Sequence, residues 1–217
     1  MTTPNSVGLV LLKKTFFIRT SWGMVTKRRR DGLHSSRFAH SGRKSHSRGA
    51  FAIRRKCPVA IIKSAVGGTT VAFDWNPDAP EKGQKLYPRT IQLVRDSLKN
   101  LKERGIKYRL EGVLWHQGEN DMLDRNLYKQ YAEGLTKLIA RFRTDLNAPD
   151  LKWYIAEVSE KGIWGMDHRS NLGILHQQQQ QVLKADPLLR WVPTSHLAFE
   201  VMGSGQPHYH YGTQGQL

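Results

Sequence analysis

The chain has 217 residues, enough for one domain with a full hydrophobic core, with or without an added arm. No stretch approaches the roughly 18 consecutive apolar residues of a membrane-spanning helix, so no membrane span is predicted. The only cysteine, Cys57, excludes an internal disulfide and leaves the redox compartment open. Composition also leaves the oligomeric state open.

The net charge of +16 is concentrated in the first quarter of the chain. Residues 1–56 hold 14 Lys and Arg against one acidic residue, a net +13, which leaves +3 for the rest. Residues 26–50 are rich in Ser, Arg, His and Gly and show neither helical nor strand periodicity. We therefore expect 1–50 to be a basic arm, poorly ordered or aberrant, and 51–217 to be the folded domain.

The N-terminus lacks the pattern of a secretory signal peptide. The apolar run "VGLVLL" (7–12) is short, Lys13 and Lys14 follow it, and no small-residue cleavage site is present. The compartment therefore stays open. A short strand is expected at 15–21, "TFFIRTS", running into a turn.

From Phe51 onward, strand-like and helix-like segments alternate. Strands are predicted at 59–63, 108–116, 152–159 and 190–194, and helices at 88–103, 124–144 and 172–185. Gly105 is expected to cap the end of the first helix, and Asp124 the start of the second. This alternation indicates a parallel sheet covered by helices on both faces. The tail, 203–217, is expected to be a loop.

Polar and small residues directly follow two of these strands. "HQGEND" (116–121) comes after the apolar run Val113–Trp115, and "SAVGGTT" (64–70) follows the first strand of the domain. So many polar groups behind a buried strand are costly unless each has a hydrogen-bond partner. Open parallel sheets bind ligands at the carboxyl ends of their strands. Both loops are therefore predicted to belong to a functional site.

Three short blocks, in this order, resemble a known enzyme family. "AVGGT" (65–69), "WHQGEND" (115–121) and "HYGTQGQ" (210–216) are similar to blocks of the SGNH hydrolases of the sialate O-acetylesterase and carbohydrate esterase family six type. The resemblance covers 51–217. It implies an α/β fold with three α/β/α layers and a flavodoxin-like parallel sheet. It also implies hydrolysis of acetyl esters on a sugar or polysaccharide by a serine and a histidine, with no metal or organic cofactor.

The resemblance implies roles for residues at matching positions. His210 would be the general base, and Gln117 would offer its side-chain amide to the oxyanion. A backbone N–H of the Gly67–Gly68 turn would be a second donor, since a residue without Cβ lets substrate approach the backbone. Gly118 would line the same substrate-binding site. Trp115 would pack in the core.

Some of these residues allow other interpretations. Glu119 would be a buried carboxylate that orients neighbouring loops, although it could equally cap the next helix or accept backbone N–H bonds. Gly67 and Gly68 could serve the turn alone. His208 and His210 flank Tyr209, but no Cys or acidic ligand with zinc spacing accompanies them, so no metal site is predicted.

The sequence departs from the family in two blocks. The family has its nucleophile in G-Q-S-N directly after the first strand, and the nearest match here is "IRTSWGM" (18–24), which makes Ser21 the candidate nucleophile. Ser64 also follows a strand but is expected to be structural. The Asp that often precedes the late histidine by three residues is replaced by Pro207. The sequence stops at Leu217, where relatives continue into a closing helix.

Three functions therefore remain to be compared. The first is a carbohydrate O-acetyl esterase, and the second is an inactive relative that binds carbohydrate or nothing. The third is nucleic-acid binding through "KRRR" (27–30), which would give steep salt dependence. The arm has no interleaved aromatic residues and no known reading module, so nucleic acid ranks last as a partner. Relatives of the family are often exported.

Overall fold

The computed structural model describes residues 7–12, 59–79, 83–159, 162–163, 166–197, 199–201 and 207–211. Side chains are described for 59–79, 83–159 and 168–197. Ser21 and the strand expected at 15–21 lie outside the described residues, and His210 is described only by its backbone.

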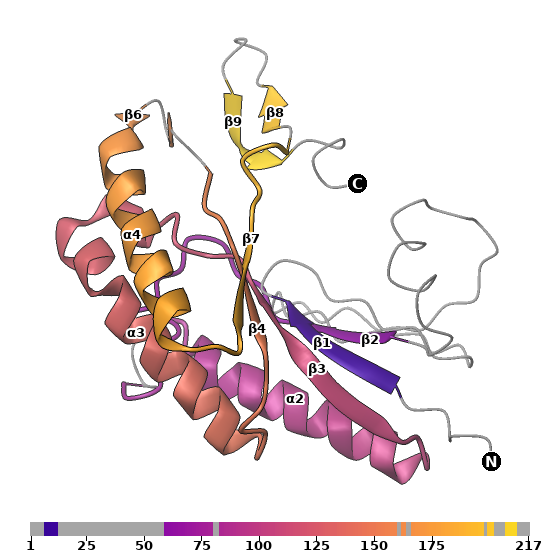
Figure 1. Ribbon diagram of the computed structural model, residues 1–217. Helices are drawn as coiled ribbons and strands as arrows, with labels where there is room; N and C mark the ends of the chain where they lie inside the picture. Colours follow the sequence, from indigo (N-terminus) through magenta and orange to yellow (C-terminus); the bar gives the residue numbers. More distant parts are fainter. Residues whose placement is uncertain are drawn as a thin grey trace.

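Five parallel strands form the main sheet, in the order β2-β1-β3-β4-β7 (Figure 1). The strands are β1 (Val7–Leu12), β2 (Val59–Lys63), β3 (Tyr108–Trp115), β4 (Trp153–Ala156) and β7 (Leu189–Val192). In this flavodoxin-like order the chain runs from β1 to one edge and then crosses back to the other side of β1. The predicted α/β fold with a flavodoxin-like parallel sheet is confirmed.

Three helices connect the strands: α2 (Leu86–Glu103), α3 (Arg125–Asp145) and α4 (Arg169–Ala185). Right-handed crossovers in one direction place them on the same face of the sheet, where Figure 1 shows them together. On the strands whose side chains are described, residues that face the helices are buried and their neighbours are more exposed, as in the alternation of Val113, Leu114 and Trp115. Among the described residues, no helix covers the other face of the sheet.

The predicted ends of two helices are confirmed by their hydrogen bonds. After α2, Gly105 adopts φ +66° and its N–H donates to Lys102 O at 3.0 Å, while Ile106 N donates to Leu101 O at 2.9 Å. These two bonds are a Schellman motif, which requires the left-handed conformation that glycine adopts without strain. Before α3, the Asp124 carboxylate accepts from Asn126 N at 2.7 Å.

Two parts of the chain differ from the prediction. β1 was not predicted, because a short apolar run also resembles a truncated leader, whereas a continuous apolar run is typical of a strand buried inside a parallel sheet. The predicted loop, 203–217, contains the strand β9 (Pro207–Tyr211), which pairs antiparallel with β8 (Phe199–Val201), so the prediction is wrong at 207–211. Alternating His and Tyr suit a strand. The domain boundary at residue 51 stays a prediction, although β1 precedes it.

The core under the helices is mostly aliphatic and contains a cluster of aromatic side chains. Trp153 is fully buried and lies 5.2 Å from Phe142, edge to face, and 5.7 Å from Trp115, measured between ring centroids. Trp115 is 2% exposed and also contacts Trp75, so its predicted core position is confirmed. Such pairs add to the hydrophobic stabilisation of their buried area. In the part of the chain described here, no helix is both long and apolar enough to cross a bilayer.

Candidate active site

The two polar loops follow β2 and β3, the neighbours of β1, and lie at the same edge of the sheet. Leu12, the last residue of β1, is opposite Lys63 of β2 and Leu114 of β3. The three strands therefore end level with one another. The chain reverses its direction across the sheet at β1, and this switch point is where sheets of this order bind ligands.

Gln117 joins the two loops. It is fully buried, and its Nε2 donates to Thr69 O at 2.7 Å and to a carboxylate oxygen of Asp121. A primary amide has two N–H hydrogens, so both have acceptors. Its Oε1 is buried and has no hydrogen-bond partner among the described residues. The role of Gln117 as an oxyanion donor stays a prediction, and it requires Nε2 to give up one of these two acceptors.

Two buried carboxylates fix the residues that follow the glycine turn. Asp121, 1% exposed, accepts from Val71 N at 2.9 Å, and Asp74 accepts from Thr70 N at 2.8 Å. Asp121 is the first residue of the short 3₁₀ helix η2 (Asp121–Leu123), so the bond to Val71 joins the start of η2 to the other loop. The backbone from Thr69 to Val71 is thus held at three consecutive residues.

Tyr131 of α3 is hydrogen-bonded to the loop after β3. Its hydroxyl donates to Gln117 O at 2.7 Å and accepts from Trp115 Nε1 at 3.1 Å. Burial raises the pKa of Tyr131 well above its ordinary value, and the negative charge of Asp121 raises it further. The neutral phenol therefore keeps its proton and remains a donor to the loop.

Glycine is required at two positions of the site. Gly68 has φ +69° and is exposed, and among the described residues its N–H has no acceptor. Gly118 has φ +142°, and a Cβ there would lie 2.8 Å from Leu175 Cδ2 and 3.0 Å from Val158 Cγ2. Gly118 thus lets α4 pack against the loop and faces the core, while Gly68 presents its backbone to solvent.

Asn120 was not singled out in the sequence. A Cβ on Gly68 would lie 3.9 Å from Asn120 Nδ2, so this half-buried amide lies beside the glycine turn. No acceptor for Asn120 Nδ2 is found within the described residues. Asn120 belongs to the polar block "HQGEND", so the sequence did mark it as a candidate. The sequence alone could not show which of the two amides, Gln117 or Asn120, lies beside the glycine turn.

The other predicted residues fall in different places. Glu119 is half-buried, not buried as expected. Ser64 is 8% exposed and its hydroxyl lies 2.6 Å from Thr90 Oγ1 of α2, in agreement with a structural role. His210 lies on β9, and Figure 1 shows the β8–β9 hairpin at the top, toward which β4 and β7 run.

A second polar cluster follows β4 and β7, and sequence analysis missed it. Glu157 Oε2 accepts from Thr194 N at 2.9 Å and from Ser195 N at 3.0 Å, and Thr194 Oγ1 donates to Glu157 O at 2.7 Å. Burial acts to raise the pKa of Glu157, but these N–H donors outweigh it and lower the pKa below its ordinary value. The cluster fixes the chain where it leaves β7 toward the β8–β9 hairpin.

Glu157 should make stability depend on acid pH. Its folded-state pKa is lowered, so its contribution is present above the unfolded-state pKa of about 4.3 and is lost as pH falls through the folded-state value. Because the side chain is only half-buried and solvent partly screens its charge, we expect at most about 1 kcal/mol. Urea unfolding of wild type and Glu157→Gln at pH 3 to 7 tests this. The difference between them should shrink at low pH, and parallel curves would contradict the assignment.

The described residues contain no group of three or more His, Cys, Asp or Glu placed to hold a metal ion. The chemistry available at the described edge is hydrogen bonding: backbone N–H groups and a side-chain amide beside a glycine turn. Such donors stabilise negative charge on an oxygen atom.

Comparison with known proteins identifies the family. The family model described as carbohydrate esterase, sialic acid-specific acetylesterase, matches residues 35–217. The chain belongs to this family. The sheet order, and the position of both polar loops at the carboxyl ends of β2 and β3, are consistent with this family.

The chain shares low sequence identity with individual carbohydrate esterases. It is 33% identical to a probable carbohydrate esterase of Arabidopsis thaliana over 93 residues, 43% of this chain and 31% of that protein. The chain therefore aligns with less than a third of that relative. The crystal structure of the same plant protein has a TM-score of 0.63 and 18% identity, and the match covers 98% of this chain and 93% of that chain.

A carbohydrate acetylesterase of Xanthomonas citri gives the same TM-score, 0.63, at 14% identity, over 96% of this chain and 53% of that chain. At such low identities these two structures establish the shared fold, which is SGNH-like.

Proposed function

We propose that the protein hydrolyses acetyl esters of a sugar or polysaccharide, using a serine nucleophile and a histidine base. One observation carries the proposal: the glycine turn and the "HQGEND" loop are joined by Gln117 and Asp121 at the switch point of the sheet. The Asn120 amide lies beside Gly68, since a Cβ on Gly68 would be 3.9 Å from Asn120 Nδ2. The family membership supports an ester of a carbohydrate as the substrate class.

In the proposed reaction, the serine hydroxyl attacks the acetyl carbonyl carbon while His210 accepts its proton. The carbonyl oxygen becomes negatively charged, and the Gly68 N–H and the Asn120 amide donate to it. The bond to the sugar oxygen then breaks, and the histidine returns the proton to that oxygen. Water hydrolyses the acetyl-serine and releases acetate. Neither a metal nor an organic cofactor takes part.

Ser21 is the proposed nucleophile, and Glu119 is proposed to orient the loops around it. The alternative is an inactive relative. It is favoured by one sequence fact, the absence of a G-Q-S-N block, because Arg19, Thr20 and Trp22 surround Ser21 instead.

Hydrolysis of p-nitrophenyl acetate and of an acetylated sugar tests the proposal, together with labelling by a fluorophosphonate and mass spectrometry of the adduct. Wild type should hydrolyse both esters and carry the label on Ser21. Ser21→Ala should lose label and turnover, and His210→Ala should lose turnover, because the serine then has no base.

Ser64→Ala is the matched control, because Ser64 also follows a strand but is bonded to Thr90. It should keep label and turnover. A folded wild type with neither turnover nor label would establish the inactive relative. Label retained by Ser21→Ala would place the nucleophile at another serine.

A further inference from the structure

Asp121 is a buried carboxylate that accepts hydrogen bonds from both loops of the site. It is 1% exposed, its Oδ1 accepts from Val71 N at 2.9 Å, and its Oδ2 accepts from Gln117 Nε2. Burying a carboxylate is costly unless strong donors surround it. Here the donors come from residues 50 positions earlier and 4 positions earlier in the sequence. The carboxylate therefore stabilises one relative placement of the two loops.

Asp121 binds the backbone of the segment 69–71, which directly follows the exposed glycine turn. Asp74 fixes Thr70 N, Gln117 fixes Thr69 O and Asp121 fixes Val71 N, so the backbone directly after Gly68 is fixed at successive residues. Among the described residues, the N–H groups of Gly67 and Gly68 themselves have no acceptor. The direction of the Gly68 N–H thus depends on the bonds that follow it.

We propose that Asp121 is a positioning residue of the active site, which holds the Gly68 N–H in place to donate to the substrate carbonyl oxygen. The expected effect on catalysis rests on the proposed esterase function. The effect on the position of the Gly68 N–H does not, and it can be measured in a protein without turnover. Because Asp121 is buried, it acts through Val71 and Gln117 and not by contact with the substrate. A donor fixed before substrate binds needs no reorganisation when charge develops, which is why a small displacement is costly.

Asp121→Asn in the full chain is the test. The new amide keeps the shape of the carboxylate, but one of its atoms is now a donor that faces either Gln117 Nε2 or Val71 N. Two donors cannot pair, so the loop should shift. We expect kcat on p-nitrophenyl acetate to fall at least tenfold while KM changes less than twofold. The amide NMR signal of Gly68 should shift and its hydrogen exchange should accelerate.

Asp186→Asn is the control. Asp186, like Asp121, accepts from one backbone N–H and one side chain, here that of Arg143, but it lies before the start of β7, at the edge of the sheet opposite to the site. It should lower the unfolding midpoint without changing kcat or the Gly68 signal. The proposal is overturned if Asp121→Asn leaves the Gly68 signal and exchange rate as in wild type. It is equally overturned if, in an active protein, kcat stays within twofold of wild type. If wild type shows no turnover, the esterase proposal fails and the NMR comparison alone decides the role of Asp121.

Discussion

Gly118→Ala is expected to lower the free energy of unfolding by about 3 kcal/mol, the sum of a packing clash and backbone strain. The added Cβ would lie 2.8 Å from Leu175 Cδ2 and 3.0 Å from Val158 Cγ2. Leu175 is fully buried in α4, so it cannot move away without opening the core. The φ of +142° is also one that alanine rarely adopts.

Gly173→Ala provides the control for Gly118→Ala. Gly173 lies within α4, and a Cβ there meets no atom within 4 Å. Alanine is favoured over glycine in a helix, so this variant should be more stable by about 0.5 to 1 kcal/mol. Urea unfolding of both variants measures the two effects. A cost below about 1 kcal/mol for Gly118→Ala would mean that α4 does not pack on this loop as described.

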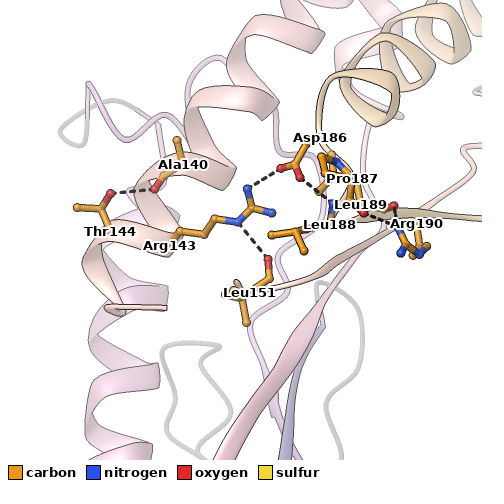
Figure 2. Close-up of polar contacts among 9 residues, drawn as sticks. All are labelled: Ala140, Arg143, Thr144, Leu151, Asp186, Pro187, Leu188, Leu189 and Arg190. Carbon is orange, nitrogen blue, oxygen red and sulfur yellow. Dashed lines mark hydrogen bonds and ion pairs between the residues drawn. The ribbon is translucent and has the colours of Figure 1, made fainter. Parts of the chain in front are cut away.

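Arg143→Ala should also destabilise the protein, by about 2 to 3 kcal/mol, less than the value for a fully buried pair because both side chains keep some exposure. Figure 2 shows the contacts that would be lost. Arg143 Nη1 lies 2.5 Å from Asp186 Oδ2, and Arg143 Nε donates to Leu151 O at 3.1 Å. Asp186 Oδ1 in turn accepts from Leu188 N at 2.8 Å. One guanidinium therefore ties α3 to the chain before β4 and before β7.

The solvent-exposed ion pair Lys99–Glu103 is the control for the pair Arg143–Asp186. Its side chains are 75% and 59% exposed, against 17% and 21% for Arg143 and Asp186. Glu103→Gln should leave the urea midpoint unchanged, because solvent screens an exposed pair. A double-mutant cycle of Arg143→Ala with Asp186→Ala isolates the coupling between the two residues. Additive effects would show that the loss comes from Leu151 O and from packing instead.

Much of the framework could be predicted from local sequence. The helices predicted at 88–103 and 124–144, the cap at Asp124 and the glycine after α2 depend on patterns within a few residues, and the structure confirms them. The position of both polar loops at the carboxyl edge also followed, because parallel strands end at one edge. β1 was missed, since six apolar residues fit more than one structure when their neighbours are unknown.

The partners within the site could not be predicted in the same way. The sequence identified Gln117 as a polar residue behind a buried strand, but Thr69, which binds its amide, lies 48 residues away. Asp121 lay in a predicted loop and Glu157 in the predicted strand 152–159, and nothing in the sequence showed that each accepts a hydrogen bond from the backbone of a distant loop.

The amino-acid sequence by itself thus determined which segments form strands and helices and which blocks carry polar groups, because those properties depend on near neighbours. Only the tertiary structure decided which polar atoms are already bonded to the protein and which face solvent. The sheet order places β1 between β2 and β3, and this brings together loops that are far apart in the chain. Hydrogen bonds require atoms within about 3 Å, so they form only after that order is established.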